Sequence, residues 1–300
     1  MVISLTSFPA RLPHIAPCLE SLVTQKGAED CLVLWLGKEQ FPHGMDDIPE
    51  IIRPFSASKG GPVDIRFTED IRSFTKLLPA LEAFPENTII TVDDDVSYAP
   101  HTIDILKKAH AQNPTAIFAH AVSDLYRSHG EWRRTSGTHG FFTSPQPLRM
   151  MLGIGAVLYP PHALCDFVLD RQLFQKLCPT NDDIWFWYCA VRNGTQILKV
   201  RNALQDPLFL QDVGVVGGLS KVNESNGDSV NRSYLKNILT YDSSMSQTMS
   251  TVYRHHTYRL ALAKLARFLC HYPSQAVRCY QSGGWRFLKT EIRRTIEAER

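Results

Sequence analysis

The stretch Thr88-Ile89-Ile90-Thr91-Val92-Asp93-Asp94-Asp95-Val96 decides the fold of this chain. Its first five residues are mostly β-branched and apolar, which predicts a buried strand of a parallel sheet. Three aspartates follow at once. In a doubly wound α/β sheet, ligands bind just beyond the carboxyl ends of such strands. The stretch therefore predicts a central strand and one edge of a binding site.

The three aspartates, called here the first acidic run, are typical of a cation site. Side chains alternate along an extended segment, so we expect Asp93 and Asp95 to lie on one side and Asp94 on the other. Such a pair can hold one divalent ion, and its hard oxygen ligands favour Mg or Mn, which also bind phosphate oxygens. The alternative is a solvated acidic turn or a helix cap without any ligand.

The segments before the first acidic run predict an α/β order. Residues 2–5 and 31–36 are expected to be strands, with helical spacing of apolar residues between them. The loop at residues 6–11 leaves the first strand at its carboxyl end, where a nucleotide would lie. We therefore expect Thr6 and Arg11 to contact a nucleotide, although an exposed charge at a helix start would also explain Arg11.

Two further elements supply candidate binding residues. Residues 63–67 predict a strand and are followed by Asp70 and Lys76, near the start of a predicted helix. A lysine there can meet a diphosphate as a point charge, with a surface ion pair as the alternative. Gly153, in the strand expected at residues 150–159, would let the backbone approach a ligand closely. A glycine bulge within that strand is the other interpretation.

A second acidic run, Asp182 and Asp183, precedes a strongly aromatic segment. Thr180 or Asn181 can cap a helix here, and Gly194 is a typical helix stop. A helix N-terminus stabilises the charged form of a carboxylate, which favours a general base over an acid. Plain helix capping would account for either residue if the two acidic runs were far apart.

Composition and charge limit the remaining possibilities. The chain has 300 residues, 44% of them hydrophobic and 21% charged, enough for one sizeable core. Seven cysteines without a CxxC pair predict reduced core residues. We find no signal-like or membrane-spanning run and expect a cytoplasmic protein. Residues 214–231, rich in Gly, Ser and Asn, are expected to form a loop that serves as a lid.

The C-terminal residues are basic. From Val252 to Arg300 there are ten Lys or Arg against three Asp or Glu, although the whole chain carries only +2. Interleaved aromatic residues make this tail suitable for the anionic inner face of the cell membrane. A basic helix packed on the domain, or an oligomer contact, is an equal alternative. No nucleic-acid-binding motif accompanies the charge, so we expect no nucleic acid partner.

The ordered motifs resemble those of bacterial GT-A glycosyltransferases of the family-2-like, DxD-containing kind. The motifs are SLTSFPARL, SFTKLLPAL, IITVDDDVSYAP, GIGAVLYPP and NDDIWFW. The resemblance implies an α/β fold with a GT-A type, Rossmann-like mixed sheet flanked by helices over residues 1–240. Residues 241–300 would be a basic helical C-terminal extension. The family also implies a nucleotide-sugar donor, most often a UDP-sugar, held through Mn or Mg.

The resemblance carries roles for the acidic residues. Asp93 and Asp95 would contact the ribose and the metal, with Asp94 among the donor-binding residues. Asp183 would match the base of the ED-type motif of inverting members. Asp182 replaces the glutamate of that motif, which leaves open which of the two carboxylates is the base.

The function expected is an inverting transfer of a sugar to a saccharide acceptor, such as a surface-polysaccharide or lipid-linked precursor. Metal and Lys76 or Arg11 would stabilise the departing diphosphate. One alternative is a sugar-phosphate nucleotidyltransferase, whose glycine-rich, basic N-terminal phosphate loop is missing here. The other is a non-catalytic nucleotide- or glycan-binding module.

Overall fold

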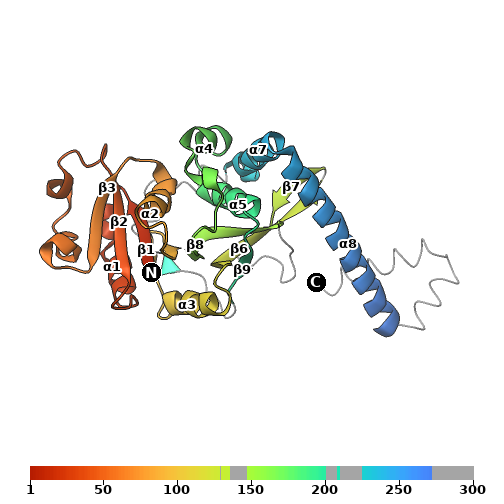
Figure 1. Ribbon diagram of the computed structural model, residues 1–300, viewed down its shortest axis with the longest axis horizontal. Coiled ribbons are helices and arrows are strands. Elements are labelled where there is room, and N and C mark those ends of the chain that lie inside the picture. Colours follow the sequence, from red (N-terminus) through yellow and green to blue (C-terminus); the bar gives the residue numbers. More distant parts are fainter. Residues whose placement is uncertain (129, 136–146, 201–207, 210–224, 272–300) are drawn as a thin grey trace. The chain divides into compact units, whose positions relative to one another are not determined.

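A computed structural model of the chain is shown in Figure 1. It describes residues 1–128, 130–135, 147–200, 208–209 and 225–271. Two compact units are present, Met1–Ser246 and Gln247–Arg300. The first unit is an α/β domain with a mixed sheet flanked by helices, which confirms the predicted fold class.

The main sheet has the strand order β3-β2-β1-β4-β8-β6-β7, with β9 paired to β6. Its strands are β1 (Val2–Ser7), β2 (Cys31–Gly37), β3 (Val63–Thr68), β4 (Ile89–Thr91), β6 (Ile117–Ser128), β7 (Glu131–Arg134), β8 (Arg149–Tyr159) and β9 (Ile197–Lys199). The strands β3, β2, β1 and β4 run parallel, whereas β8 is antiparallel to both of its neighbours. A second, antiparallel pair joins β5 (Val96–Ser97) to β10 (Leu208–Phe209).

In the described residues the helices are α1 (Ala16–Val23), α2 (Leu78–Ala83), α3 (Thr102–Gln112), α4 (Arg171–Leu177), α5 (Asp182–Arg192), α7 (Ser225–Tyr241) and α8 (Ser243–His271). In the first unit, α3 packs against the strands β6 and β8 of the main sheet, and α5 packs against β8 (Figure 1). None of the helices in this part of the chain is long and apolar enough to cross a membrane.

Between β2 and β3 the chain forms 3₁₀ turns at Gly44–Asp47 and Arg53–Phe55. One local prediction differs from the structure. The loop expected at residues 214–231 overlaps α7, which begins at Ser225, so its last residues are helical. The earlier part of that predicted lid lies outside the described residues.

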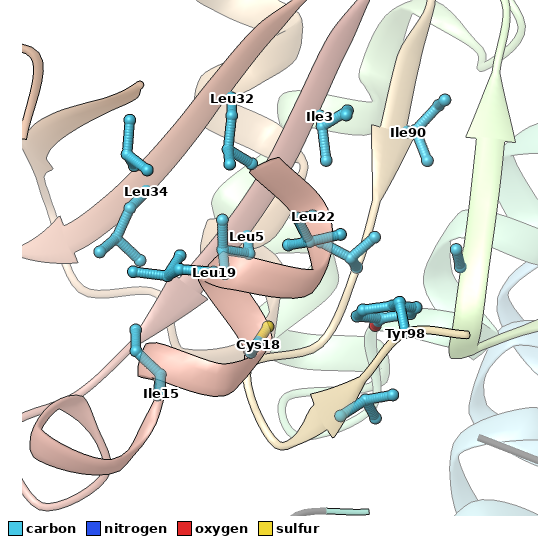
Figure 2. Close-up of a cluster of buried hydrophobic side chains, with 14 of the residues drawn as sticks. Ile3, Leu5, Ile15, Cys18, Leu19, Leu22, Leu32, Leu34, Ile90 and Tyr98 are labelled. Atoms are coloured by element: carbon cyan, nitrogen blue, oxygen red, sulfur yellow. The ribbon is translucent and has the colours of Figure 1, made fainter. Parts of the chain in front are cut away.

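The core explains why the N-terminal segment folds as β-α-β. Ile3, Leu5 and Leu34 alternate along their strands and are fully buried on the face that α1 covers. Figure 2 shows Leu19 and Leu22 of α1 lying against these strand residues. Each buried side chain of this size contributes roughly 1.5–3 kcal/mol. Apolar residues recur at every second position in the strands and at about every fourth position in α1. These residues therefore pack together in one apolar layer.

A bend in β8 brings that strand over the end of β4. The strand β8 pairs with β4 only through the segment from Val157 to Tyr159. Just before it, Gly155 and Ala156 have φ of +82° and +89°, and the pairing with β6 shifts register nearby. The first half of β8 therefore continues past the carboxyl end of β4. Gly153 lies in this overhanging half.

Candidate active site

The carboxyl ends of β1, β2, β3 and β4 lie at one edge of the sheet, because these strands are parallel and in adjacent register. Thr6, Asp70 and the first acidic run all belong to this edge. Asp182 and Asp183 begin α5, which contacts β8. The structure therefore brings the two acidic runs to the same end of the domain.

The first acidic run does not alternate as expected. The strand β4 ends at Thr91, and Asp94 and Asp95 lie in a turn. As a result Asp94 and Asp95 share one partner, the guanidinium of Arg11, at 2.6 and 3.2 Å. Asp93 instead lies 2.9 Å from the ammonium of Lys76. The prediction that Asp93 and Asp95 lie on one side assumed an extended segment. The strand instead ends at Thr91, and the chain turns at Asp94 and Asp95.

Asp94 is the anchor of this turn. Its carboxylate accepts hydrogen bonds from the Ser7 hydroxyl at 2.6 Å and from Arg11 at 2.6 Å. Burial raises the pKa of Asp94, while Arg11 and Ser7 lower it. The guanidinium of Arg11 also lies 5.4 Å from the centroid of the Phe8 ring. Arg11 thus serves first to fix the shape of the acidic turn.

The backbone of Asp93 is held from the other side. Its N–H donates to the Tyr98 hydroxyl at 2.7 Å, and its carbonyl accepts from the Cys18 thiol at 3.5 Å. Sequence reasoning did not single out Tyr98 or Ser7 as individual residues. The sequence feature that could have identified them is their position in the chain. Ser7 is the last residue of β1, and Tyr98 lies in the VSYAP segment that follows the first acidic run.

Lys76 joins the two acidic runs. Its ammonium lies 2.9 Å from Asp93 and 3.2 Å from Asp182. The carbonyl of Lys76 accepts a hydrogen bond from Ser4 at 2.6 Å, and Ser4 in turn accepts from the Trp35 indole at 2.9 Å. Burial alone would lower the pKa of Lys76, but Asp182 and Asp93 raise it well above its usual value. The side chain is therefore a fixed internal cation.

The second acidic run is held by the start of α5. The Asn181 side chain accepts from the Ile184 N–H at 2.9 Å and caps the helix, as predicted. Asp183 accepts the Gly153 N–H at 2.8 Å through Oδ1. Asp182 Oδ2 is buried and makes no well-aligned hydrogen bond, although the Lys76 ammonium is within ion-pair distance.

Asp183 has a perturbed pKa. Burial, followed by the negative charge of Asp182, raises the pKa of Asp183 to about 7, against the opposing effect of Lys76. The helix N-terminus was expected to favour the charged form, but burial is the larger effect here. A carboxylate with this pKa exchanges protons readily near neutral pH, which suits a general base.

The site carries excess negative charge. Within the described residues, the ion pairs bring Arg11 and Lys76 to four of the five carboxylates of the two acidic runs. Burial and the neighbouring Asp93 raise the pKa of Asp95 to about 6. Such a raised pKa means that the charged form of Asp95 lacks full compensation.

Thr6 and Asp70 lie at the same edge with other partners. The Thr6 hydroxyl donates to the Trp35 carbonyl at 3.0 Å. Asp70 accepts from the Gln40 side chain at 2.6 Å and from the Arg72 N–H at 2.8 Å. Both residues thus lie at the same sheet edge as the first acidic run, and these hydrogen bonds join them to other residues.

Neither a family model nor a curated protein matches the sequence. Among solved structures, S. aureus TarS 1–349, also solved with UDP-GlcNAc, has 11% identity and a TM-score of 0.42, covering 81% of this chain and 72% of that one. Francisella tularensis 2-C-methyl-D-erythritol 4-phosphate cytidylyltransferase has 8% identity and a TM-score of 0.42, covering 71% of this chain and 96% of that one. CMP:2-keto-3-deoxy-manno-octonic acid synthetase, solved with CTP, has 11% identity and a TM-score of 0.41, covering 66% and 89%. Identities and TM-scores this low do not assign a reaction, so the reaction has to be argued from the residues of the site.

Proposed function

We propose that this chain is a metal-dependent GT-A glycosyltransferase that moves a sugar from a nucleotide-sugar, most simply a UDP-sugar, to a saccharide hydroxyl with inversion. The observation that carries the proposal is the meeting of the two acidic runs across Lys76 at the carboxyl edge of the sheet. One carboxylate, Asp183, has a separate hydrogen bond and a pKa raised to about 7. A cluster of carboxylates that would bind a cation and a carboxylate that would accept a proton thus lie together.

Asp93 and Asp95 would hold Mn or Mg together with the diphosphate of the donor, although in the structure they form ion pairs with Lys76 and Arg11. Burial, followed by the charge of Asp93, raises the pKa of Asp95, and this uncompensated negative charge supports the assignment. Within the described residues, no group of three or more His, Cys, Asp or Glu is arranged to hold a metal by itself. Mg and Mn commonly bind one or two carboxylates plus substrate phosphates, so two aspartates fit this donor set. The ion would stabilise the charge of the departing diphosphate.

Asp183 is the proposed base. Its Oδ1 accepts the Gly153 N–H, which leaves Oδ2 to accept the proton of the acceptor hydroxyl. The hydroxyl oxygen attacks the anomeric carbon as the bond from that carbon to the diphosphate oxygen breaks. Asp182 Oδ2 lies 3.2 Å from the Lys76 ammonium, so that oxygen is engaged in an ion pair. Thr6 and Asp70 are proposed to contact the nucleoside of the donor.

The acceptor and the location of the enzyme are proposed from charge. A surface-polysaccharide precursor, as in capsule or lipopolysaccharide synthesis, or a lipid-linked saccharide, would be presented at the inner face of the membrane. The ten Lys or Arg between Val252 and Arg300 would hold the enzyme there peripherally. Much of this tail, residues 272–300, lies outside the described residues.

The test is calorimetric titration of UDP, GDP, CMP and dTDP, with Mn and with EDTA. Wild type should bind one nucleotide in the presence of Mn, Asp95→Ala should lose this binding, and Asp183→Asn should keep it. Product analysis with the matching nucleotide-sugar should show that Asp183→Asn lowers turnover by about 10²–10⁴-fold. An inverted anomeric configuration of the product would support the single displacement.

Other outcomes would refute the proposal or support a different function. Absence of nucleotide binding under every condition would refute the proposal. Release of pyrophosphate from a nucleoside triphosphate and a sugar phosphate would indicate a nucleotidyltransferase instead. Nucleotide or glycan binding without any turnover, unchanged in Asp183→Asn, would indicate a binding module.

A further inference from the structure

We infer that Gly153 is a positioning residue for Lys76 and Asp183 rather than a contact for the donor. The inference rests on the proposed function and deepens it. The sequence suggested that a glycine here lets the backbone approach a ligand. In the structure, the groups that approach Gly153 are side chains of the protein itself.

The missing side chain of Gly153 leaves room for the Lys76 ammonium. A Cβ at this position would lie 2.5 Å from Lys76 Nζ and 3.5 Å from Lys76 Cε. A lysine terminus normally moves aside at little cost. Here it is held by Asp93 at 2.9 Å and by Asp182 at 3.2 Å. A methyl group at position 153 would therefore displace the ammonium from the two acidic runs.

The same Cβ would press on the proposed base. It would lie 3.0 Å from Asp183 Oδ1, the oxygen that accepts the Gly153 N–H at 2.8 Å. An alanine keeps that N–H, so the substitution isolates the steric effect from the hydrogen bond. We therefore expect Gly153→Ala to disturb the alignment of Asp183 and the charge beside it, while the nucleoside-binding end of the site is unaffected.

Gly37 provides a matched control at the same sheet edge. It is the last residue of β2, and a Cβ there would lie 2.8 Å from Asp70 Cβ. Both glycines are thus crowded by a neighbour, but Gly37 is crowded by a proposed donor contact. Comparing Gly153→Ala with Gly37→Ala separates an effect on turnover from an effect on donor binding.

The first experiment measures kcat and donor KM, with the dissociation constant of the Mn-nucleotide, for both variants. We expect Gly153→Ala to lower kcat by about 10²-fold, as for a misplacement of catalytic groups. The dissociation constant of the Mn-nucleotide should change less than kcat, because Asp93 is the one proposed metal ligand that contacts Lys76. Gly37→Ala should mainly raise the donor KM. If Gly153→Ala instead raises the nucleotide dissociation constant and leaves kcat intact, Gly153 is a donor contact and the inference is wrong.

The second experiment is a double-mutant cycle with Lys76→Met. Methionine lacks an atom in the place of Nζ, so it removes the contact that the new Cβ would make at 2.5 Å. Adding Gly153→Ala to Lys76→Met should change kcat by less than about twofold, because the two substitutions act through one group. Independent, multiplicative losses would overturn the inference. If Gly153→Ala alone does not fold, the double variant should be no less stable than Lys76→Met, and a further loss of stability would also overturn the inference.

The two proposals fail in different ways. A wild-type protein that binds no nucleotide refutes the proposed function, whatever Gly153 does. In that case the same four proteins, compared by their free energies of unfolding, still test the positioning of Lys76. Coupling between the two substitutions would support the contact between Gly153 and Lys76, and additivity would refute it.

Discussion

Replacing Lys76 by methionine should destabilise the protein in a pH-dependent way. The ammonium is the partner that Asp93 and Asp182 share, at 2.9 and 3.2 Å. Methionine keeps most of the apolar length of the lysine and removes its charge. The substitution therefore asks how much of the stability depends on one buried cation among carboxylates.

The magnitude follows from burial. The side chains of Lys76 and Asp182 are 10% and 11% exposed, so solvent screens this pair little, whereas Asp93 is 25% exposed. Removing one partner of a buried ion pair costs about 3–5 kcal/mol, because a charge is left uncompensated. Partial exposure of Asp93 places the expected loss near the lower end, at about 3 kcal/mol at pH 8.

The sign of the pH dependence comes from the carboxylates. The pKa of Asp183, raised to about 7 in the folded protein, means that the folded state binds more protons than the unfolded state between about pH 4 and pH 7. Its contribution to stability therefore falls as the pH rises through this window. Because Lys76 lowers the pKa of Asp183, its loss raises that pKa further and extends the fall to higher pH. The pKa of Lys76 itself is raised, so its contribution is lost only above its usual titration range.

Urea denaturation of wild type and Lys76→Met at several pH values measures this effect. We expect a difference of about 3 kcal/mol at pH 8 that shrinks to about 1–2 kcal/mol near pH 5.5, where the carboxylates can take up protons. The control is Lys107→Met, because Lys107 pairs with Asp30, which also accepts the Gly27 N–H at 2.7 Å. The loss in free energy of unfolding should be smaller for Lys107→Met than for Lys76→Met. A Lys76→Met loss below about 1 kcal/mol at pH 8, or one that grows on acidification, would refute the reasoning.

Three further changes test separate parts of the site. Asn181→Ala should lower the free energy of unfolding by about 1 kcal/mol, because the cap bond to the Ile184 N–H is lost, and unchanged urea denaturation would contradict that cap. The rate of the chemical step should rise with pH through the pKa of Asp183, about 7, since only the ionised form accepts a proton; a flat rapid-quench profile from about pH 6 to 8 would exclude Asp183 as the base. Ser7→Ala should cost about 1–2 kcal/mol in thermal denaturation, because buried Asp94 loses one of its donors, and an unchanged melting temperature would show that this bond adds nothing.

Local sequence patterns predicted much of the first unit. The strands β1, β2 and β3 begin where expected, because their apolar residues are buried by the neighbouring helices and strands. The helix α5 follows its Asn181 cap and ends before Gly194, which has φ of +75°. In these places the local preference and the tertiary structure agree.

The partners within the site could not be predicted in this way. The end of β4 at Thr91 is set by its pairing with β1 and β8, and this end abolishes the alternation expected for Asp93 and Asp95. Contact of Lys76 with both acidic runs depends on the register in which β8 pairs with β4 and on the packing of α5 against β8, and a hydrophobic pattern does not encode either. The same packing buries Asp183 and reverses the expected direction of its pKa shift.

The hydrogen bonds that shape the first acidic run join residues far apart in the chain. Ser7 and Asp94 are separated by 87 positions, and Arg11 and Asp94 by 83. Contacts of this kind form only after long segments of chain have been ordered, and folds rich in them mature slowly. During refolding, helical content should therefore return before these contacts with Asp94 form. Recovery of the nucleotide binding proposed for this turn would report the completion of the β1–β4 sheet rather than the formation of any single element.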